Sequence, residues 1–254
     1  AYRALAAAVS DLAAMGAKPS HFTLSLTLPD SSYEWLSEFS LGLKELANLF
    51  EFPLVGGDTS RGPLTIGLQV HGLVPKNEML TRANAQVGDI IAVTGTLGDA
   101  GAALRLIEKT ALSDPPSTEE QFLLSRYYAP TPRIEQGIQL RALANACIDV
   151  SDGLLADAQH IAAKSSVSLE IDAYCLPLSD AIISTHKNNA INLALSAGDD
   201  YELLFTIPEA NWGILKQNDV ANIYTRIGRV NQGKGLNLTG FSGKIDSTGY
   251  RHFE

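Results

Sequence analysis

Apolar residues in the first third of the chain follow helical and extended patterns in turn. Alanine and leucine dominate residues 2–15 and favour a helix there. Residues 21–28 alternate between polar and apolar side chains, which predicts a strand. Apolar side chains recur at helical spacing over residues 31–50 and predict a second helix, and short strands are expected at 53–55 and 64–74. This part of the chain therefore combines helices with a small sheet.

The rest of the chain continues this mixture and begins with a buried strand at residues 89–95 that enters a glycine turn. A boundary is expected within residues 75–88, which gives two domains, residues 1–80 and 81–254. Further strands are predicted at 146–148, 168–171 and 201–207, and helices at 98–109, 119–127, 133–145, 154–162 and 178–187. The pattern predicts an α/β (α+β) protein.

The composition is that of an ordinary globular protein. Of 254 residues, 45% are hydrophobic, which is enough for a sizeable core. The net charge of −9 disfavours nonspecific binding to nucleic acid or to an anionic membrane. No apolar run approaches the roughly 18 residues of a membrane helix. The two cysteines lack metal-ligand spacing and favour a reducing compartment, so we expect a cytoplasmic protein.

Four acidic clusters carry the candidate chemistry, because each stands beside small or turn-forming residues. Carboxylates that are brought together repel one another unless cations lie between them. Mg²⁺ is a hard cation that binds carboxylate and phosphate oxygens together. The clusters therefore predict a site for Mg²⁺ and a polyphosphate, and they are Ser10-Asp11, Gly56-Gly57-Asp58-Thr59, Asp149-Val150-Ser151-Asp152-Gly153 and Gly198-Asp199-Asp200-Tyr201-Glu202.

The glycine pair before Asp58 stands just past the strand expected at 53–55. Glycine lets backbone N–H groups approach an anion closely, and Asp58 could then hold Mg²⁺ over the phosphates. An ordinary turn closed by an Asp58 hydrogen bond is the competing interpretation.

Asp149 and Asp152 stand at the mouth of a predicted helix. One carboxylate can hold a metal ion there while Ser151 donates to a phosphate, which the helix dipole favours. The competing interpretation is a helix cap made by Ser151 or Asp152, although a cap needs no second aspartate.

The remaining candidates are weaker when each is taken alone. Asp11 shares a helix face with small residues, but a solvated aspartate is the stronger alternative. Three acids crowd residues 199–202, which requires a cation or a positively charged substrate unless the segment is a solvated loop end. Arg82 could reach a nucleotide phosphate, although most isolated arginines lie on the surface. The histidines show no ligand spacing, and neither a P-loop nor a dinucleotide fingerprint occurs.

Taken together, the clusters resemble the bacterial thiamine-monophosphate kinases. The resemblance runs in order and spacing along essentially the whole chain, through S-D-L-A-A-M-G-A from Ser10, V-G-G-D-T from Val55, V-T-G-T-L-G-D from Val93, D-V-S-D-G-L from Asp149 and G-D-D-Y-E-L from Gly198. It implies the fold of the aminoimidazole-ribonucleotide-synthetase-like (PurM-like) superfamily. That fold has an N-terminal mixed-sheet domain, which pairs across a homodimer, and a C-terminal α/β domain.

The resemblance also implies a reaction, the ATP-dependent phosphorylation of thiamine monophosphate to thiamine diphosphate. Mg²⁺ ions bridge ATP and the acceptor in that family. By motif position, the implied metal ligands are Asp11, Asp58, Asp149 and Asp152, of which the last three form the catalytic group. The implied nucleotide contacts are Gly57, Asp58, Arg82 and Ser151.

The acceptor contacts implied by the resemblance are Asp199 and Tyr250. Asp199 stands where the family more usually has a glutamate. A carboxylate near the cationic thiazolium and an aromatic ring against the heterocycle suit this substrate, because charge attraction and π contact select it. Family members carry a further segment before Ala1, so we expect residues 1–80 to lack the first part of the N-terminal domain.

Two other interpretations stay open. Another ATP-using member of the superfamily, such as a selenophosphate synthetase, a purine-pathway cyclase or a hydrogenase-maturation dehydratase, would share the acidic clusters. A nucleotide- or Mg²⁺-binding module without turnover would share them as well. Nucleotide binding without product formation would distinguish the module from the kinase.

Overall fold

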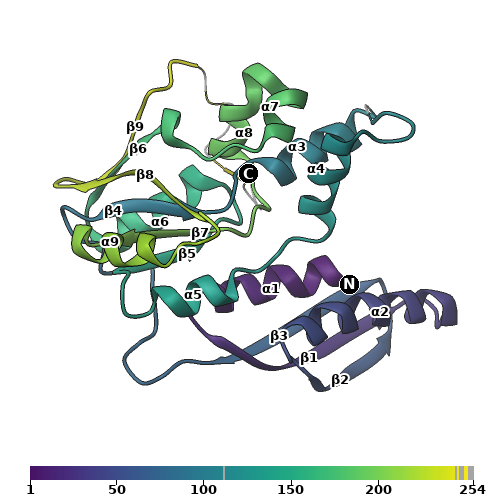
Figure 1. Ribbon diagram of the computed structural model, residues 1–254. Coiled ribbons are helices and arrows are strands. Elements are labelled where there is room, and N and C mark those ends of the chain that lie inside the picture. Colours follow the sequence, from purple (N-terminus) through teal and green to yellow (C-terminus); the bar gives the residue numbers. More distant parts are fainter. Residues whose placement is uncertain (111, 244, 246–248, 251–254) are drawn as a thin grey trace.

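Two β-sheets and the helices packed against them build the chain, as Figure 1 shows. The computed structural model describes residues 1–110, 112–243, 245 and 249–250. The strands are β1 Lys18–Leu28, β2 Leu54–Arg61, β3 Thr65–Leu73, β4 Ile90–Thr94, β5 Ala146–Asp149, β6 Ser168–Asp172, β7 Leu203–Ile207, β8 Tyr224–Asn231 and β9 Gly235–Thr239. The α-helices are α1 Tyr2–Ala14, α2 Tyr33–Leu49, α3 Asp99–Glu108, α4 Thr118–Tyr128, α5 Ile134–Leu140, α6 Leu154–Ser165, α7 Asp180–His186, α8 Ala190–Ser196 and α9 Glu209–Gln217.

The N-terminal sheet has the strand order β2-β1-β3, with β2 parallel and β3 antiparallel to β1. Phe22, Leu26 and Leu28 of β1 are buried in one core with α1 and α2. Ser25 points to the opposite, exposed face, because successive side chains of a strand point to opposite sides. One face of this sheet therefore packs on the core and the other carries polar side chains.

The glycine pair before Asp58 lies inside β2, so its expected place past a strand end is wrong. Gly57 pairs with Leu24 at a φ of 151°, and a β-carbon on Gly57 would lie 1.9 Å from the carbonyl oxygen of Leu24. The strand continues through this position because residue 57 has no side chain. Asp58 pairs with Ser25 and shares its face, which points away from the helices.

Replacing Gly57 by alanine should destabilise the sheet, whereas the same change at Gly56 should not. An alanine at position 57 would combine an unfavourable φ with a backbone clash, at a cost of roughly 2 kcal/mol or more in the free energy of unfolding. Nothing lies within 4 Å of a β-carbon built on Gly56, which makes Gly56→Ala the matched control. Urea denaturation of both variants measures the difference, and equal midpoints would contradict the steric argument.

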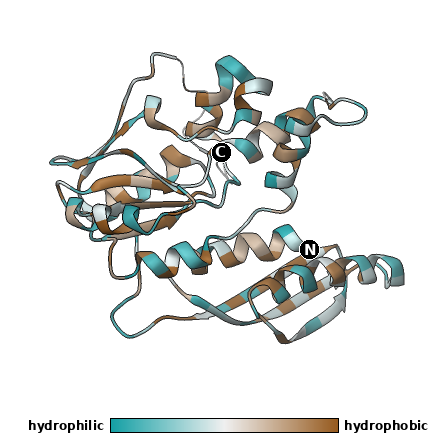
Figure 2. Cartoon of the chain, viewed as in Figure 1, coloured by the Kyte–Doolittle hydropathy of each residue, from teal (hydrophilic) through white to brown (hydrophobic). Residues whose placement is uncertain are grey.

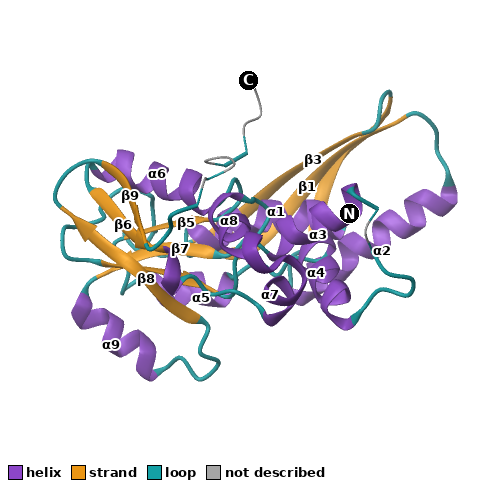
Figure 3. Cartoon of the chain, turned by 90° about the horizontal axis from the view of Figure 1, so that it is seen from above, coloured by secondary structure: helices purple, strands orange, loops and turns teal. Residues whose placement is uncertain are grey.

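The second sheet has the strand order β5-β7-β4-β8-β6-β9, and β6 with β9 is its parallel pair. β4 is buried on both faces, with Ile90 and Ala92 in the core shared with α1 and Ile91 and Val93 in the core shared with α6. Figure 2 shows apolar residues gathered along the strands of this sheet. Seen from above, α6 and α9 lie on opposite sides of it (Figure 3).

Helix α1 lies between the two sheets (Figure 1). Leu5, Val9 and Leu12 are buried in a core that also contains residues of β1 and β7. Alanines fill much of the rest of the helix and allow close packing on several sides. Asp11 is exposed, and α1 contacts β5, the strand that ends at Asp149. The packing of α1 therefore brings two of the four acidic clusters near each other.

The predicted α/β fold class and its PurM-like, two-part architecture are confirmed, although some element limits differ. The strand expected from Tyr201 begins at Leu203, and the helix expected over 133–145 ends at Leu140. The sequence analysis missed α8, α9, β8 and β9. In the case of β8, the sequence has neither an apolar run nor a clean alternation of polar and apolar residues. The boundary near residue 80 and the homodimer stay predictions. No helix in the described part of the chain is both long and apolar enough to cross a membrane.

Candidate functional site

A cavity of about 980 Å³ is lined by α1, α3, α8, the loop after β5, the segment before β7 and residues 249–250. Its lining includes small residues of α1 and α3, among them Ala7 and Gly101, which leave room for a ligand. Six of the predicted site residues line this one cavity, and they are Asp11, Asp149, Ser151, Asp152, Asp199 and Tyr250. Motifs more than one hundred residues apart in the sequence therefore converge, as a nucleotide and acceptor site requires.

Asp149 is the buried carboxylate of the cavity. Its Oδ2 accepts a hydrogen bond of 2.8 Å from the hydroxyl of Ser10, which is itself fully buried in α1. Burial and the nearby carboxylate of Asp11 raise the pKa of Asp149 to about 6, against the opposing effects of the Ser10 hydrogen bond and of Arg82. The charged form of Asp149 is therefore disfavoured by its surroundings, and a cation beside it would offset that cost.

The loop after β5 is held by Asp157 in the first turn of α6. Its Oδ2 accepts hydrogen bonds from the backbone N–H groups of Ser151, Asp152 and Gly153, at 3.0, 3.1 and 3.2 Å. These bonds occupy backbone N–H groups at the mouth of α6, and neither Ser151 nor Asp152 makes a side-chain cap there. The hydroxyl of Ser151 and the carboxylate of Asp152 are left to face the cavity.

Asp157 should make stability depend on pH. Burial raises its pKa to about 7, although the backbone hydrogen bonds act in the opposite direction. A raised pKa means that the folded state keeps a proton which the unfolded chain loses near pH 4. The wild type should therefore lose stability relative to Asp157→Asn as the pH rises from about 4 to about 7.

The measurement is the free energy of unfolding of both proteins in EDTA at several pH values. Asp180→Asn is the matched control, because Asp180 also lies in the first turn of a helix but is exposed. Its difference from the wild type should not follow the same curve. A pH-independent difference for Asp157→Asn would contradict the raised pKa.

The segment before β7 is fastened to the loop after β5 by backbone hydrogen bonds. Asp199 N–H donates to Ser151 O at 2.9 Å, and Tyr201 N–H donates to Val150 O at 2.8 Å. A β-carbon on Gly198 would lie 2.3 Å from the Ser151 carbonyl oxygen, so glycine permits this close approach. The two acidic motifs thus form one unit.

The two predicted acceptor residues lie on this unit. The Asp199 carboxylate accepts a hydrogen bond of 2.9 Å from the Tyr201 hydroxyl and forms an ion pair of 2.8 Å with Arg3 of α1. Tyr250 N–H donates to Asp152 O at 2.9 Å, and the Tyr250 side chain is exposed at the cavity. Residues 251–254, which follow Tyr250, lie outside the described residues.

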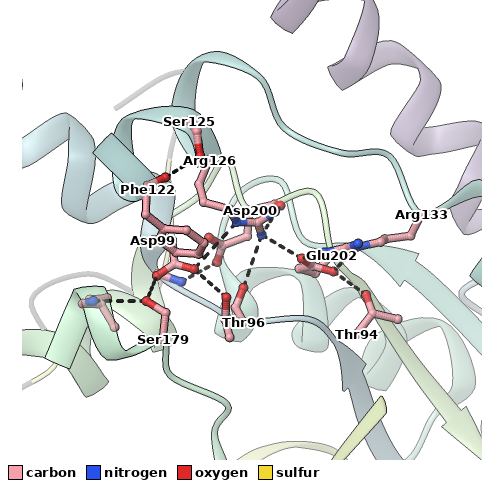
Figure 4. Close-up of polar contacts among 12 residues, drawn as sticks. Thr94, Thr96, Asp99, Phe122, Ser125, Arg126, Arg133, Ser179, Asp200 and Glu202 are labelled. Atoms are coloured by element: carbon pink, nitrogen blue, oxygen red, sulfur yellow. Dashed lines mark hydrogen bonds and ion pairs between the residues drawn. The ribbon is translucent and has the colours of Figure 1, made fainter. Parts of the chain in front are cut away.

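Glu202, the last acid of the crowded segment, is fully buried, and Figure 4 shows its polar contacts. Its carboxylate accepts hydrogen bonds from Thr94 Oγ1 at 2.6 Å, from Arg126 Nη2 at 2.7 Å and from Arg133 Nε and Nη2 at 2.6 Å each. Two internal arginines therefore balance the charge of Glu202. The interpretation of this segment as a solvated loop end is wrong for Glu202. These contacts fix the start of β7.

Asp200 and Asp99 extend the same network (Figure 4). Asp200 is buried, and it accepts a hydrogen bond of 2.8 Å from the Gly98 N–H. Asp99 accepts hydrogen bonds of 2.5 Å from Thr96 and from Ser179, and lies 3.7 Å from Nε of Arg126. Burial raises the pKa of both carboxyl groups. Asp99 and Asp200 therefore connect the turn after β4 to Ser179 and to the segment before β7.

Three predicted residues are not among those that line the cavity. Gly57 and Asp58 are exposed on β2, where Asp58 points to the sheet face away from α1. Arg82 is exposed, but it lies near enough to Asp11 and Asp149 to oppose the rise in pKa that burial causes at both carboxyl groups. Among the described residues, no three His, Cys, Asp or Glu side chains converge closely enough to enclose a metal ion alone. The roles of Gly57, Asp58 and Arg82 stay predictions.

The sequence analysis missed several residues that position the site. Asp157, Arg126 and Arg133 hold the loops that carry the cavity acids, and Arg3 pairs with Asp199. The spacing of Asp157 behind Asp152 could have suggested a helix-capping acid. The three arginines carry no local signal, because their partners lie far away in the sequence.

Comparison with known proteins decides the family. Residues 1–74 match "AIR synthase related protein, N-terminal domain", and residues 86–240 match "AIR synthase related protein, C-terminal domain". Thiamine-monophosphate kinase from Escherichia coli (strain K12) is 49% identical over 217 residues, which are 85% of this chain and 66% of that protein. The chain belongs to the thiamine-monophosphate kinases of the AIR synthase related family. It spans about two thirds of the length of this relative.

Solved structures of the thiamine-monophosphate kinase family agree with the fold. The crystal structure of the enzyme from Stenotrophomonas maltophilia K279a has a TM-score of 0.90 and 43% identity, and the match covers 95% of this chain and 78% of that chain. A structure of AaThiL complexed with AMPPCP and TMP has a TM-score of 0.88 and 34% identity, with 99% and 79% covered. The kinase family thus includes a close structural relative that binds an ATP analogue together with TMP.

Proposed function

We propose that the protein transfers the γ-phosphate of ATP to thiamine monophosphate and forms thiamine diphosphate. The observation that carries the proposal is the meeting of Asp11, Asp149, Asp152, Asp199 and Tyr250 around one cavity. The relative complexed with AMPPCP and TMP supports the same pair of substrates. ATP is then a co-substrate and not a tightly held cofactor.

Three carboxylates of the cavity lining suit Mg²⁺. Asp11, Asp149 and Asp152 offer only carboxylate oxygens, the donors that hard cations prefer. A Mg²⁺ ion is usually held by one or two carboxylates, several waters and substrate phosphates, so three converging protein ligands are not needed. We infer that these aspartates hold Mg²⁺ jointly with the phosphates. The bound ions would neutralise phosphate charge during transfer.

Asp199 and Tyr250, which line the same cavity, suit the acceptor. The thiazolium ring carries a fixed positive charge and no N–H donor on its quaternary nitrogen, so a carboxylate attracts it by charge alone. Asp199 supplies such a carboxylate, and the exposed ring of Tyr250 supplies an aromatic face. The shorter side chain of aspartate places the carboxylate nearer to the loop backbone than a glutamate would.

The reaction needs positioning more than acid–base catalysis. A terminal phosphate oxygen of thiamine monophosphate attacks the γ-phosphorus of ATP in line, the bond to the β,γ-bridging oxygen breaks, and ADP leaves. The acceptor phosphate is already ionised near neutral pH, so no strong base has to remove a proton. The protein orients the two phosphates and lowers their mutual repulsion. A cavity whose lining, among the residues that the structure describes, is rich in carboxylates and has no histidine fits these tasks.

Gly57, Asp58 and Arg82 belong to the nucleotide side of the proposal. The face of β2 that carries Asp58 is exposed in the single chain. The proposed homodimer, in which the N-terminal sheets pair, would cover such a face and place Asp58 at a shared site. Arg82 is then the guanidinium that reaches a nucleotide phosphate through paired donors.

An acceptor panel tests the proposal against its alternatives. With Mg²⁺ and ATP, the full-length protein should release ADP with thiamine monophosphate, and not with thiamine or selenide. ADP release with selenide would favour a sister enzyme of the superfamily. Nucleotide binding without ADP release for any acceptor would favour the binding module.

A further inference from the structure

Arg3 of α1 is the positively charged partner of Asp199 in this structure. Its Nη2 lies 2.8 Å from Asp199 Oδ2, while the Tyr201 hydroxyl donates to Oδ1. The side chains of Arg3 and Asp199 are 30% and 31% exposed, so the pair is in contact with solvent. The carboxylate proposed to attract the thiazolium therefore already has a positive partner.

Arg3 has a second partner besides Asp199. Its guanidinium carbon lies 3.7 Å from the centroid of the Tyr127 ring on α4, a cation–π contact that does not depend on Asp199. A partly exposed ion pair such as Arg3–Asp199 contributes at most a factor of about five to an equilibrium constant. Breaking it should therefore cost little while the contact with Tyr127 remains, and an incoming cation could replace Arg3 beside Asp199.

The position of Arg3 along α1 matches the ring end of the acceptor. Arg3, Ala7 and Asp11 follow one another at intervals of four residues, so they share one face of the helix. Eight residues of helix rise about 12 Å, so Arg3 stands about two turns before Asp11. Between these two positions α1 lines the cavity only with the small side chains of Ala7 and Ala8. An acceptor whose phosphate lies near Asp11 would therefore reach the Arg3–Asp199 pair along this face of α1.

We propose that Arg3 is an internal counterion of Asp199 that a cationic acceptor ring displaces, so that the Arg3–Asp199 pair selects acceptors by the charge of the ring. This inference rests on the proposed function and adds a specificity-determining residue to it. When a cationic ring breaks the Arg3–Asp199 pair, its own attraction to Asp199 replaces the attraction that is lost. A neutral ring of the same shape has no such attraction to Asp199, so Arg3 stays in place.

Calorimetric titration with thiamine monophosphate, in Mg²⁺ and without nucleotide, tests the inference on the full-length protein. Arg3→Gln removes the competing cation and should lower the dissociation constant about three- to fivefold. Arg3→Lys keeps the charge and should stay near the wild type. The phosphate ester of 4-methyl-5-(2-hydroxyethyl)thiazole, whose ring is neutral, should bind Arg3→Gln no more tightly than the wild type.

Three results would overturn the inference. The first is an affinity of Arg3→Gln for thiamine monophosphate that equals or falls below that of the wild type. The second is an equal increase in affinity for the neutral thiazole ester. The third is an equal increase in affinity for thiamine monophosphate when Arg3→Gln is combined with Asp199→Asn. Thermal unfolding of each variant checks that the fold is intact. If the wild type binds and phosphorylates thiamine monophosphate, any of these results refutes only the role of Arg3. If the wild type neither binds nor phosphorylates it, the proposed function fails as well.

Discussion

Asp149→Asn should lower the kcat of the kinase reaction by roughly 10²–10³-fold, the usual cost of removing one preorganised electrostatic group from an active site. The amide keeps the size of the side chain and can still accept the hydrogen bond from Ser10, which measures 2.8 Å in the wild type. What it loses is the negative charge that we assign to Mg²⁺. The Mg²⁺ concentration for half-maximal rate should rise in the same variant.

Stability should not follow activity in this variant. The pKa of Asp149 is raised to about 6 because burial and Asp11 disfavour its charge, so above that pH an uncharged residue should leave the metal-free protein as stable or more stable. Asp180→Asn, at an exposed position on α7, is the control and should keep both rate and stability. A fully active Asp149→Asn enzyme with unchanged Mg²⁺ dependence would remove Asp149 from the metal site.

Glu202→Gln should lower the free energy of unfolding by roughly 3–5 kcal/mol, because removing one partner of a buried ion pair leaves the other charge uncompensated. Both Arg126 and Arg133 depend on the Glu202 carboxylate, which is fully buried. Asp200 stays near Arg126 and would offset part of the loss, so the lower end of this range is expected. Equilibrium urea denaturation measures the change.

Glu209→Gln is the matched control for this prediction. Glu209 is 57% exposed and pairs with Arg229 at 3.0 Å and Arg226 at 3.7 Å, so it also answers two arginines, but in water. Exposed pairs contribute about 1 kcal/mol or less. Similar losses of stability in the two variants would mean that the buried network does not hold the start of β7.

The residues that surround the cavity could be predicted where local sequence carries the chemistry. Asp149 and Asp152 bracket a strand-to-helix turn, and this turn does lie at the cavity. The hydrogen bonds inside the turn could not be predicted, because backbone N–H groups at a helix mouth can donate either to a ligand or to a side chain of the protein. Here the N–H groups of residues 151–153 all donate to Asp157, which only the folded loop shows.

The partners of the crowded acids could not be predicted for a different reason. Arg133 and Arg126 stand 69 and 76 positions before Glu202, and no periodicity links them to it. Gly57 illustrates a third limit, since two glycines favour a turn by propensity, and here one of them serves a strand that passes close to a neighbouring carbonyl group. Contacts between residues far apart in the sequence determine both the partners of Glu202 and the conformation at Gly57.

Formation of thiamine diphosphate from ATP and thiamine monophosphate, followed by chromatography with and without Mg²⁺, tests the proposed function most directly. This chain and a version extended before Ala1 to the length of its relatives should be compared in the same assay. We predict Mg²⁺-dependent thiamine diphosphate from the extended version, with one ADP for each product molecule. Product from residues 1–254 as well would show that they suffice. Absence of thiamine diphosphate from both, under conditions where ATP binds, would contradict the assignment of the cavity to phosphoryl transfer.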